Sequence, residues 1–375
     1  MRVTRLALRD FRGYATEEVA LGPGLTVVTG RNGAGKTNLL EGLYFGCTGR
    51  SCRTTNEREC VRWGERVCRV EVGAEDPDGA HVLAVGFEPG HPKRLTADDA
   101  PVDRLVDVVA RPLVSVFLPD RLELVKGTPA GRRAHLDQVV GALWPARAGT
   151  RRAYAAALAQ RNALLGRIRA GYASRESLRA WDSELARHGI ALMDDRARTV
   201  ALLAERFGDL AAELGLEGEG MLVYRPRAQA SDAEGLAAEL AERADGDLDR
   251  GFTGHGPHRD ELALLRDGRE LRAYGSQGEQ RLALLALLLS ERDVIGEARG
   301  AFPLLLLDDV MSELDTDRRE RLVERVGAHG QTVITTTELG HVPGAGDVAV
   351  TRFSVVAGTV REEQTTTVRA AVPCS

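Results

Sequence analysis

The stretch Gly30–Thr37 constrains this chain more than any other, because it fits G-x-x-x-x-G-K-[ST] at every specified position. The apolar residues 25–28 before it predict a strand, and the residues after it predict a helix that begins near Lys36. In such a unit the glycines let backbone N–H groups point at phosphate oxygens, the lysine reaches the β- and γ-phosphates, and the Thr37 hydroxyl ligates Mg²⁺. The predicted nucleotide-binding residues are Gly30, Arg31, Asn32, Gly33, Ala34, Gly35, Lys36 and Thr37.

Composition excludes several other classes of protein. The chain has 375 residues, 43% of them hydrophobic, which is enough for two or three lobes. It has no run of about 18 uninterrupted apolar residues and no secretory pattern at its N-terminus, so we expect a cytoplasmic protein. Its five cysteines form no C-x-x-C pair, which favours reduced thiols over disulfides or a zinc site.

Charge is segregated along the chain, although the net charge is only −5. Residues 126–198 contain fourteen basic and six acidic side chains, so this stretch is positive while the remainder is negative. Such segregation points weakly to a polyanionic partner. Arginines that merely solvate helix faces would give the same count, and composition does not separate the two interpretations.

Secondary-structure patterns predict that the two ends of the chain form one lobe. Alternating residues predict strands near both termini, while the Ala-, Leu- and Arg-rich segment from 129 to about 214 has helical periodicity. We therefore expect a discontinuous ATPase lobe over 1–125 and 251–375, interrupted by a helical lobe over 126–250. The expected strands are 3–8, 25–28, 67–72, 81–88, 113–117, 221–224, 261–265, 270–274, 304–307, 332–336, 348–356 and 359–363.

Two carboxylates follow a short apolar run near the end of the chain. Four leucines precede Asp308 and Asp309, the pattern of a central parallel strand that delivers acids to the carboxyl edge of a sheet. Asp308 fits the acid that holds Mg²⁺ beside the terminal phosphates, and Asp309 can orient or deprotonate an attacking water. The sequence thus predicts ATP and Mg²⁺ as ligands, with Thr37 and Asp308 at the metal and Lys36 and Asp309 in the chemistry.

The separation of these acids from the phosphate loop narrows the class. Small kinases and GTPases place the metal-binding acid within one or two βαβ steps of the loop, whereas about 270 residues intervene here. A segment just before the acidic strand resembles the S-x-G-x-Q signature of ABC-type ATPases, whose serine and helix N-terminus clamp the γ-phosphate bound to the opposite subunit. Its residues are Ser276, Gln277, Gly278, Glu279 and Gln280. A plain helix cap is the alternative.

A second segment falls where such ATPases carry a loop across the dimer interface. It consists of Ser312, Glu313, Leu314 and Asp315.

Over essentially its whole length, the chain resembles the RecF family of recombination-mediator ATPases, which are related to SMC heads. Residues 117–129, together with Arg132, Arg133, Leu136 and Asp137, are similar to one family motif. Residues 305–315 are similar to another, and 10–12 and 256–260 also match. The resemblance implies an α/β fold: an ABC-type P-loop ATPase head, with a mixed sheet, flanking helices and an antiparallel subsheet, split by a mainly helical second lobe.

The resemblance also implies a function. It suggests an ATP-dependent homodimer that binds DNA at gaps or single-strand/double-strand junctions and, with RecR and RecO, supports RecA loading in DNA repair and the SOS response. Such a protein would associate with the nucleoid. Arg12 is implied at the nucleotide, and Ser276 would act in trans. Hydrolysis should be slow, because Asp309 replaces the usual glutamate, the segment 335–337 offers no switch histidine, and no glutamine stands near Pro119.

Several questions stay open. The DNA-contacting surface lies either on arginines of the helical lobe or on the paired ATPase heads, and the sequence does not separate the two. His258 and Arg259 either form a buried structural turn or have a function that the sequence does not reveal. An ATP-binding DNA clamp without significant turnover fits the same motifs, whereas the missing glutamine and histidine argue against a membrane-transporter ATPase. The candidate DNA contacts are Arg132, Arg133, Arg151 and Arg152.

Overall fold

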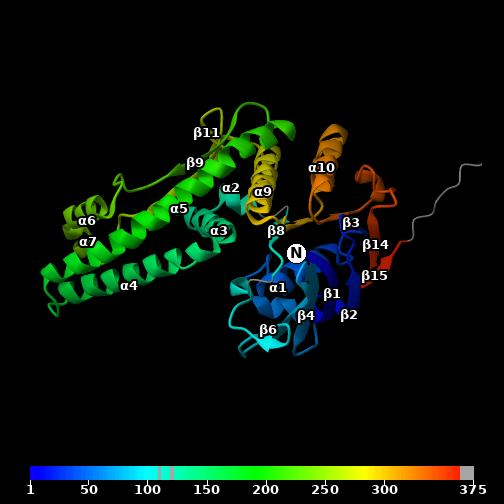
Figure 1. Cartoon of the computed structure of the whole chain (residues 1–375), viewed down its shortest axis with the longest axis horizontal. Helices are drawn as coiled ribbons and strands as arrows, with labels where there is room; N and C mark the ends of the chain where they lie inside the picture. The colour runs from blue at the N-terminus through cyan, green and yellow to red at the C-terminus, as the bar shows by residue number, and fades with distance from the viewer. Residues whose placement is uncertain (109–110, 119–121, 364–375) are drawn as a thin grey trace, which may run out of the picture. The chain divides into compact units, whose positions relative to one another are not determined.

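The computed structural model describes residues 1–108, 111–118 and 122–363 (Figure 1). The chain divides into two compact units, Met1–Pro119 with Gly300–Ser375, and Asp120–Arg299. This division differs from the expected one, since residues 251–299 belong to the second unit. The reason is packing: helix α9 (Gln277–Arg299), buried along most of its length, lies against α5 (Leu178–Glu213) and α3 (Pro129–Leu143).

One sheet of the first unit is antiparallel, with strand order β2-β1-β4-β5-β6-β7. The predicted strands 3–8, 67–72 and 81–88 are confirmed as β1, β4 and β5, and the last two pair in register around a tight turn. Helix α1 (Lys36–Thr48) packs against β4 and β5 and shares their apolar core. The strands are β1 (Arg2–Phe11), β2 (Tyr14–Ala20), β4 (Cys68–Asp76), β5 (Gly79–Phe87), β6 (Arg94–Ala97) and β7 (Ala100–Pro101).

The other sheet of this unit is mainly parallel and has the order β15-β14-β3-β13-β12-β8. All four leucines of β12 are buried, as a strand covered on both faces requires. Because β3, β13 and β12 are parallel neighbours, their carboxyl ends meet at one edge of the sheet. The strands are β3 (Leu25–Thr29), β8 (Val114–Phe117), β12 (Leu304–Leu307), β13 (Thr332–Thr336), β14 (Thr351–Val356) and β15 (Thr359–Glu362).

The last two predicted strands are largely confirmed, although β14 begins at Thr351 rather than at residue 348. Helix α10 (Thr316–Ala328) lies between β12 and β13 in the chain, and the Asp315 side chain caps its first turn by accepting from the backbone N–H of Arg318 (2.9 Å).

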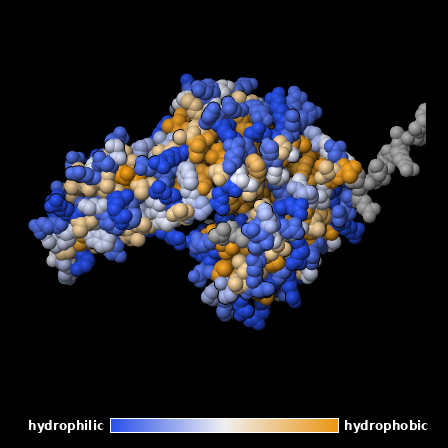
Figure 2. All heavy atoms as spheres, in the orientation of Figure 1, coloured by the Kyte–Doolittle hydropathy of each residue, from blue (hydrophilic) through white to orange (hydrophobic). Residues whose placement is uncertain are grey.

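The second unit is mainly helical. Helices α4 (Thr150–Arg169) and α5 pack lengthwise against each other, and in Figure 2 their visible surface mixes hydrophilic and weakly hydrophobic residues. A three-stranded sheet, β11-β10-β9, completes the unit. Its strands are β9 (Gly220–Arg225), β10 (Glu261–Arg266) and β11 (Arg269–Glu270). The remaining helices are α2 (Glu123–Lys126), α6 (Ala233–Glu242), α7 (Ala244–Arg250) and α8 (Leu271–Tyr274).

The strand predicted over 270–274 is wrong for most of its length. The hairpin between β10 and β11 forms, but β11 has two residues and the chain then turns into α8. The backbone N–H of Gly275 and the side chain of Gln280 both bond the carbonyl of Leu271, which closes a helical turn there. The hydrogen bonds that Gly275 and Gln280 donate to the Leu271 carbonyl outweigh the local preference of this segment for a strand.

The cysteine prediction holds within the described residues. Cys47, Cys52, Cys60 and Cys68 are buried and form no disulfide with one another, while Cys374 lies outside the described residues. Burial raises the pKa of Cys47, Cys60 and Cys68 to about 12, so these thiols are unreactive near neutral pH. Across the described residues, no helix is long and apolar enough to cross a membrane.

Candidate nucleotide-binding site

The phosphate loop joins the carboxyl end of β3 to the N-terminus of α1. Gly33 and Gly35 have φ angles of 79° and 120°, a backbone region that other L residues rarely adopt, so the loop needs glycine there. The Lys36 ammonium donates to the carbonyls of Gly30 (2.7 Å) and Arg31 (3.3 Å), and its side chain is 6% exposed. The loop therefore curls around its own lysine, which is the geometry that a triphosphate site requires.

Two halves of the sequence meet at this site. The Thr37 hydroxyl at the start of α1 donates to Asp308 Oδ2 (2.8 Å) after β12, and the Thr335 hydroxyl of β13 donates to Asp308 Oδ1 (2.6 Å). A hydroxyl and a carboxylate in contact are the oxygen donors that Mg²⁺ favours beside phosphates. Among the described residues no group of three or more His, Cys, Asp or Glu forms a metal cage.

Asp309 occupies a strained position beside this pair. Its φ of 45° is left-handed, its backbone N–H donates to Thr335 Oγ1 (3.0 Å), and its Oδ1 is buried without a hydrogen-bond partner among the described residues. Burial raises the pKa of Asp309, and the neighbouring Asp308 raises it further, while Lys36 opposes the shift. A half-buried carboxylate with a raised pKa and an oxygen that has no hydrogen-bond partner among the described residues can accept a proton from water.

Glu41 is a site residue that the sequence did not reveal. This carboxylate on α1 is fully buried and binds the Arg12 guanidinium through two hydrogen bonds of 2.8 Å. It also accepts from Ser51 (2.5 Å) and lies 3.4 Å from an amino nitrogen of Arg53. Glu41 thus fixes Arg12 and the polar loop after α1 beside the phosphate-loop helix. The signal in the sequence is a single acid within the mainly apolar stretch 39–47 of this helix.

The signature segment lies in the second unit, at the start of α9. Ser276 and Glu279 form a reciprocal cap: the Ser276 N–H donates to Glu279 Oε2 (2.7 Å), and the Glu279 N–H donates to Ser276 Oγ (3.3 Å). Glu279 also pairs with Arg266, and the Gln280 amide is buried against the carbonyls of Leu271 and Gly275. The cap fits the plain interpretation of this segment.

Residues 276–278 of the signature segment are exposed. Ser276, Gln277 and Gly278 lie at the N-terminus of a 23-residue helix and face solvent. A Cβ added at Gly278 would meet nothing within 4 Å. A phosphate could therefore approach this helix end from outside the chain.

Residues 312–315 form a short turn after Asp309. The Ser312 hydroxyl donates to the Asp309 carbonyl (2.7 Å), which ties this turn to the candidate water-activating residue. Ser312, Glu313 and Asp315 are exposed, whereas Leu314 is 5% exposed and packs in the core. Three of the four predicted interface residues can thus face a partner.

Of the candidate DNA contacts, Arg132 is wrong. Its side chain is 3% exposed, its guanidinium binds both oxygens of Glu261 at 2.8 Å, and it donates to two main-chain carbonyls. Arg133 is half-buried and donates to the Asp260 carbonyl (2.7 Å). Arg151 and Arg152 are exposed, although Arg151 lies 3.3 Å from a carboxylate oxygen of Asp137.

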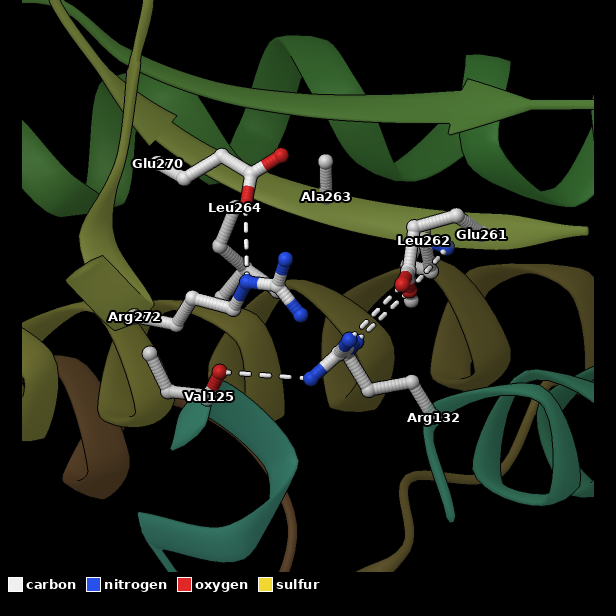
Figure 3. Close-up of a pocket in the computed structure, with 8 residues that line it drawn as sticks. All are labelled: Val125, Arg132, Glu261, Leu262, Ala263, Leu264, Glu270 and Arg272. Atoms are coloured by element: carbon white, nitrogen blue, oxygen red, sulfur yellow. Dashed lines mark hydrogen bonds and ion pairs between the residues drawn. The ribbon is translucent and has the colours of Figure 1, made fainter. Parts of the chain in front are cut away.

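A small pocket on β10 shows where Arg132 is used (Figure 3). Figure 3 shows Arg132 reaching Glu261 and the carbonyl of Val125, with Arg272 beside Glu270. The pocket is lined by Val125, Arg132, Glu261, Leu262, Ala263, Leu264, Glu270 and Arg272. Its cations are already paired with its acids, so the pocket offers no unpaired charge to an anionic ligand.

Known proteins resemble this chain both in sequence and in fold. A model of the AAA domain matches residues 5–81. The chain is 41% identical to the DNA replication and repair protein RecF of Anaeromyxobacter sp. (strain Fw109-5), over 92% of this chain and 95% of that protein. The solved structure of the recombination mediator protein RecF-ATP in the RecFOR pathway matches with a TM-score of 0.85 at 25% identity, covering 97% of this chain and 98% of that chain.

A crystal structure of the SMC head bound to the C-winged helix domain of ScpA matches in fold alone. Its TM-score is 0.60 at 16% identity, and the match covers 97% of each chain. These likenesses confirm the ATPase-head architecture expected from the sequence.

Proposed function

Because this chain belongs to the RecF family of DNA replication and repair proteins, we propose that it binds Mg·ATP and dimerises around it to hold DNA. The observation that carries the proposal is the contact between Thr37 and Asp308 (2.8 Å), which joins the phosphate loop to an acid 271 residues away. A solved relative is described as RecF-ATP, which supports the nucleotide. The DNA would be gapped or carry single-strand/double-strand junctions, and RecR, RecO and RecA would act in the same pathway.

The chain's own residues divide the work at the nucleotide. The backbone N–H groups of the phosphate loop and the Lys36 ammonium bind the phosphates. Thr37 and Asp308 hold Mg²⁺, which when bound neutralises charge on the terminal phosphates. Thr335 keeps the Asp308 carboxylate oriented by donating to its second oxygen (2.6 Å). Arg12, held by Glu41, flanks α1 at the nucleotide.

The lid of each site comes from the second copy. The exposed N-terminus of α9 in one protomer, with Ser276 and Gly278, faces the γ-phosphate bound by its partner. We place residues 312–315 at the same interface. The hydrogen bond from the Ser312 hydroxyl to the Asp309 carbonyl, which holds their turn beside the nucleotide site, supports this placement. Nucleotide binding and dimerisation are therefore one event.

Hydrolysis then separates the two copies. Asp309 accepts a proton from the attacking water, and its side chain is one methylene shorter than the glutamate usual in ABC-type ATPases, so the step is slow. Turnover acts as a timer on the DNA-bound dimer.

A second candidate is an ATP-binding DNA clamp without significant turnover. The observation that favours it is Asp309 in place of the usual glutamate, because the shorter side chain holds its carboxylate farther from an attacking water. ATP turnover measured with gapped DNA present separates the two candidates, since the clamp alone releases no phosphate.

The main experiment is gel filtration with and without Mg·ATP and gapped DNA, on wild type and Ser276→Arg. The variant should bind ATP as wild type does but stay monomeric, because a bulky cation replaces the serine at the helix end. A variant that dimerises normally would remove the composite site from the proposal. Wild type that stays monomeric at saturating Mg·ATP with DNA would contradict the proposal itself.

A further inference from the structure

The loop between α7 and β10 carries a sequence motif that the nucleotide site does not use. It includes the 3₁₀ turn Pro257–Arg259 and the segment 256–260, one of the stretches that resemble the RecF family. Most of this loop is buried, and its polar groups are bonded to the helices around it. One arginine and one aromatic ring of the loop are exposed instead.

His258 belongs to the buried part. Its Nε2 lies 2.9 Å from the Thr253 carbonyl, which can only accept, so Nε2 carries the proton and Nδ1 accepts from the Tyr154 hydroxyl at 2.7 Å. Burial, together with the charges of Arg259 and Arg133, lowers the pKa of His258 to about 4. His258 is therefore a neutral structural residue, and two arginines stand close to it.

Asp260 anchors the other end of the motif. It is fully buried and accepts from the backbone N–H of Arg227 (2.8 Å), from Arg196 (3.1 Å) and from the Tyr224 hydroxyl. Its own carbonyl accepts from Arg133 (2.7 Å). A buried network with this many partners holds the backbone on either side of Arg259 in one conformation.

Arg259 itself points outward. It is exposed, and among the described residues no carboxylate lies within ion-pair distance of it. Its guanidinium carbon lies 5.5 Å from the ring centroid of Phe252, which is 42% exposed and has Arg250 at 5.9 Å as well. A guanidinium stacked on an aromatic ring keeps its in-plane N–H donors available.

The glycines of the loop leave room for further arginines. A Cβ at Gly251 would lie 2.5 Å from an amino nitrogen of Arg169, and one at Gly254 would lie 2.9 Å from an amino nitrogen of Arg250. Residues 250–259 include no acid. Arg250 is paired with the buried Asp247, whereas Arg169 and Arg259 are exposed and, within the described residues, unpaired.

We propose that this surface, defined by Phe252, Arg259, Arg250 and Arg169, binds the phosphate backbone of DNA. The proposal rests on the DNA-binding function proposed above and gives it a place in the helical unit. The fork of Arg259 matches a phosphate in shape and charge, and its ring support limits the entropy lost on contact. Backbone contacts carry no base sequence, which suits a protein that recognises gaps or junctions.

The composition of this surface favours DNA over a protein as its partner. Docking surfaces for proteins are enriched in large apolar anchors within a mixed-charge rim, whereas here the one aromatic ring already supports two guanidiniums. The surface offers donors and positive charge, which is what a phosphodiester chain takes.

The test compares Arg259→Gln with Arg187→Gln. Arg187 is also an exposed arginine of the same unit, but it is paired with Glu184 at 2.7 Å. Binding of a fluorescent gapped duplex is measured by anisotropy at several salt concentrations with Mg·ATP, and dimerisation is measured in the same samples. Arg259→Gln should weaken binding about tenfold and flatten the slope of log K against log salt by about 0.9, while dimerisation stays intact. Arg187→Gln should change neither.

Two further variants sharpen the result. Arg259→Lys keeps the charge and should retain most of the salt slope, and Phe252→Leu keeps an apolar side chain but should weaken binding less than Arg259→Gln. Wild-type binding in Arg259→Gln, or weaker binding with an unchanged salt slope, overturns the proposal.

If wild type forms the ATP dimer but binds no DNA, both this surface and the proposed DNA-binding function are wrong. If the dimer is absent but DNA still binds through Arg259, only the dimer mechanism falls.

Discussion

The phosphate-loop edge of the first unit and the arginine-rich helices of the second unit differ in the role of their charged side chains. At the edge the charged residues form the predicted site, whereas several arginines of the helices form internal ion pairs. At the edge, the Lys36 ammonium contacts its own loop and the Thr37 hydroxyl contacts Asp308. The spacing of the motifs in the sequence already predicted these positions. In the helices, Arg132, Arg161 and Arg196 are at most 3% exposed and are bound to carboxylates. A motif with fixed spacing locates function, because its residues act together, whereas a count of arginines does not separate contacts with a partner from internal ion pairs.

The largest expected effect is at the edge. Lys36→Ala removes a buried ammonium from the phosphate loop and should weaken ATP binding about 100-fold, with loss of ATP-dependent dimerisation. Isothermal titration with Mg·ATP measures the affinity. Lys126→Ala, at an exposed lysine outside the loop, is the control and should bind normally. Equal affinities would mean that this edge is not the nucleotide site.

Asp309→Asn tests the strained carboxylate. ATP turnover should fall about 100-fold while the ATP dimer persists longer, because the amide cannot take a proton from water. Phosphate release and dimer lifetime are the measurements. Asp317→Asn is the control, because Asp317 is an exposed aspartate of α10 outside the turn 312–315. If Asp309→Asn shortens the dimer's lifetime, hydrolysis does not release it.

The raised pKa of Asp309 gives this prediction a pH dependence. Because the pKa is higher in the folded protein than in the unfolded chain, the folded state binds this proton more tightly, and that stabilisation is lost as pH rises through the folded-state pKa. Turnover should rise over the same pH range, above the ordinary pKa of aspartate. Asp309→Asn should unfold at a higher denaturant concentration than wild type at neutral pH, and equal midpoints would contradict the burial argument.

Arg132→Ala tests whether this arginine of the helical unit serves an internal ion pair rather than a contact with DNA. It leaves Glu261 without its two hydrogen bonds of 2.8 Å and should lower the free energy of unfolding by about 3 kcal/mol. Urea denaturation measures this, and Arg132→Ala combined with Glu261→Gln should recover part of the loss. The salt slope of DNA binding should stay unchanged. A flattened slope without loss of stability would return Arg132 to the DNA contacts.

The smallest effect is expected at the exposed pair on α4. Arg151→Glu with Arg152→Glu should weaken DNA binding severalfold through long-range charge, and less than Arg259→Gln does through contact. Anisotropy in low and high salt measures both. If the α4 pair gives the larger change in slope, the DNA surface lies on α4.

Much of the fold was predictable because local patterns and tertiary structure agree there. The strands β1, β4, β5 and β12 follow from alternation or from an unbroken apolar run, and the phosphate loop follows from spacing alone. Residues 270–274 became mainly helix because the Gly275 N–H and the Gln280 side-chain amide, both outside the segment, donate to the Leu271 carbonyl within it. The boundary expected after residue 250 was wrong because α9 buries its apolar sides against α5 and α3.

The sequence by itself determined the phosphate loop, the paired acids and the family, since each depends on residue types at fixed positions. Only the tertiary structure decided which arginines are available, because the exposure of a guanidinium depends on carboxylates distant in sequence. Arg132 lost its predicted role to Glu261 in this way, and Glu41 gained one through Arg12. Arg259 is left facing solvent because the residues beside it, His258 and Asp260, are held inside.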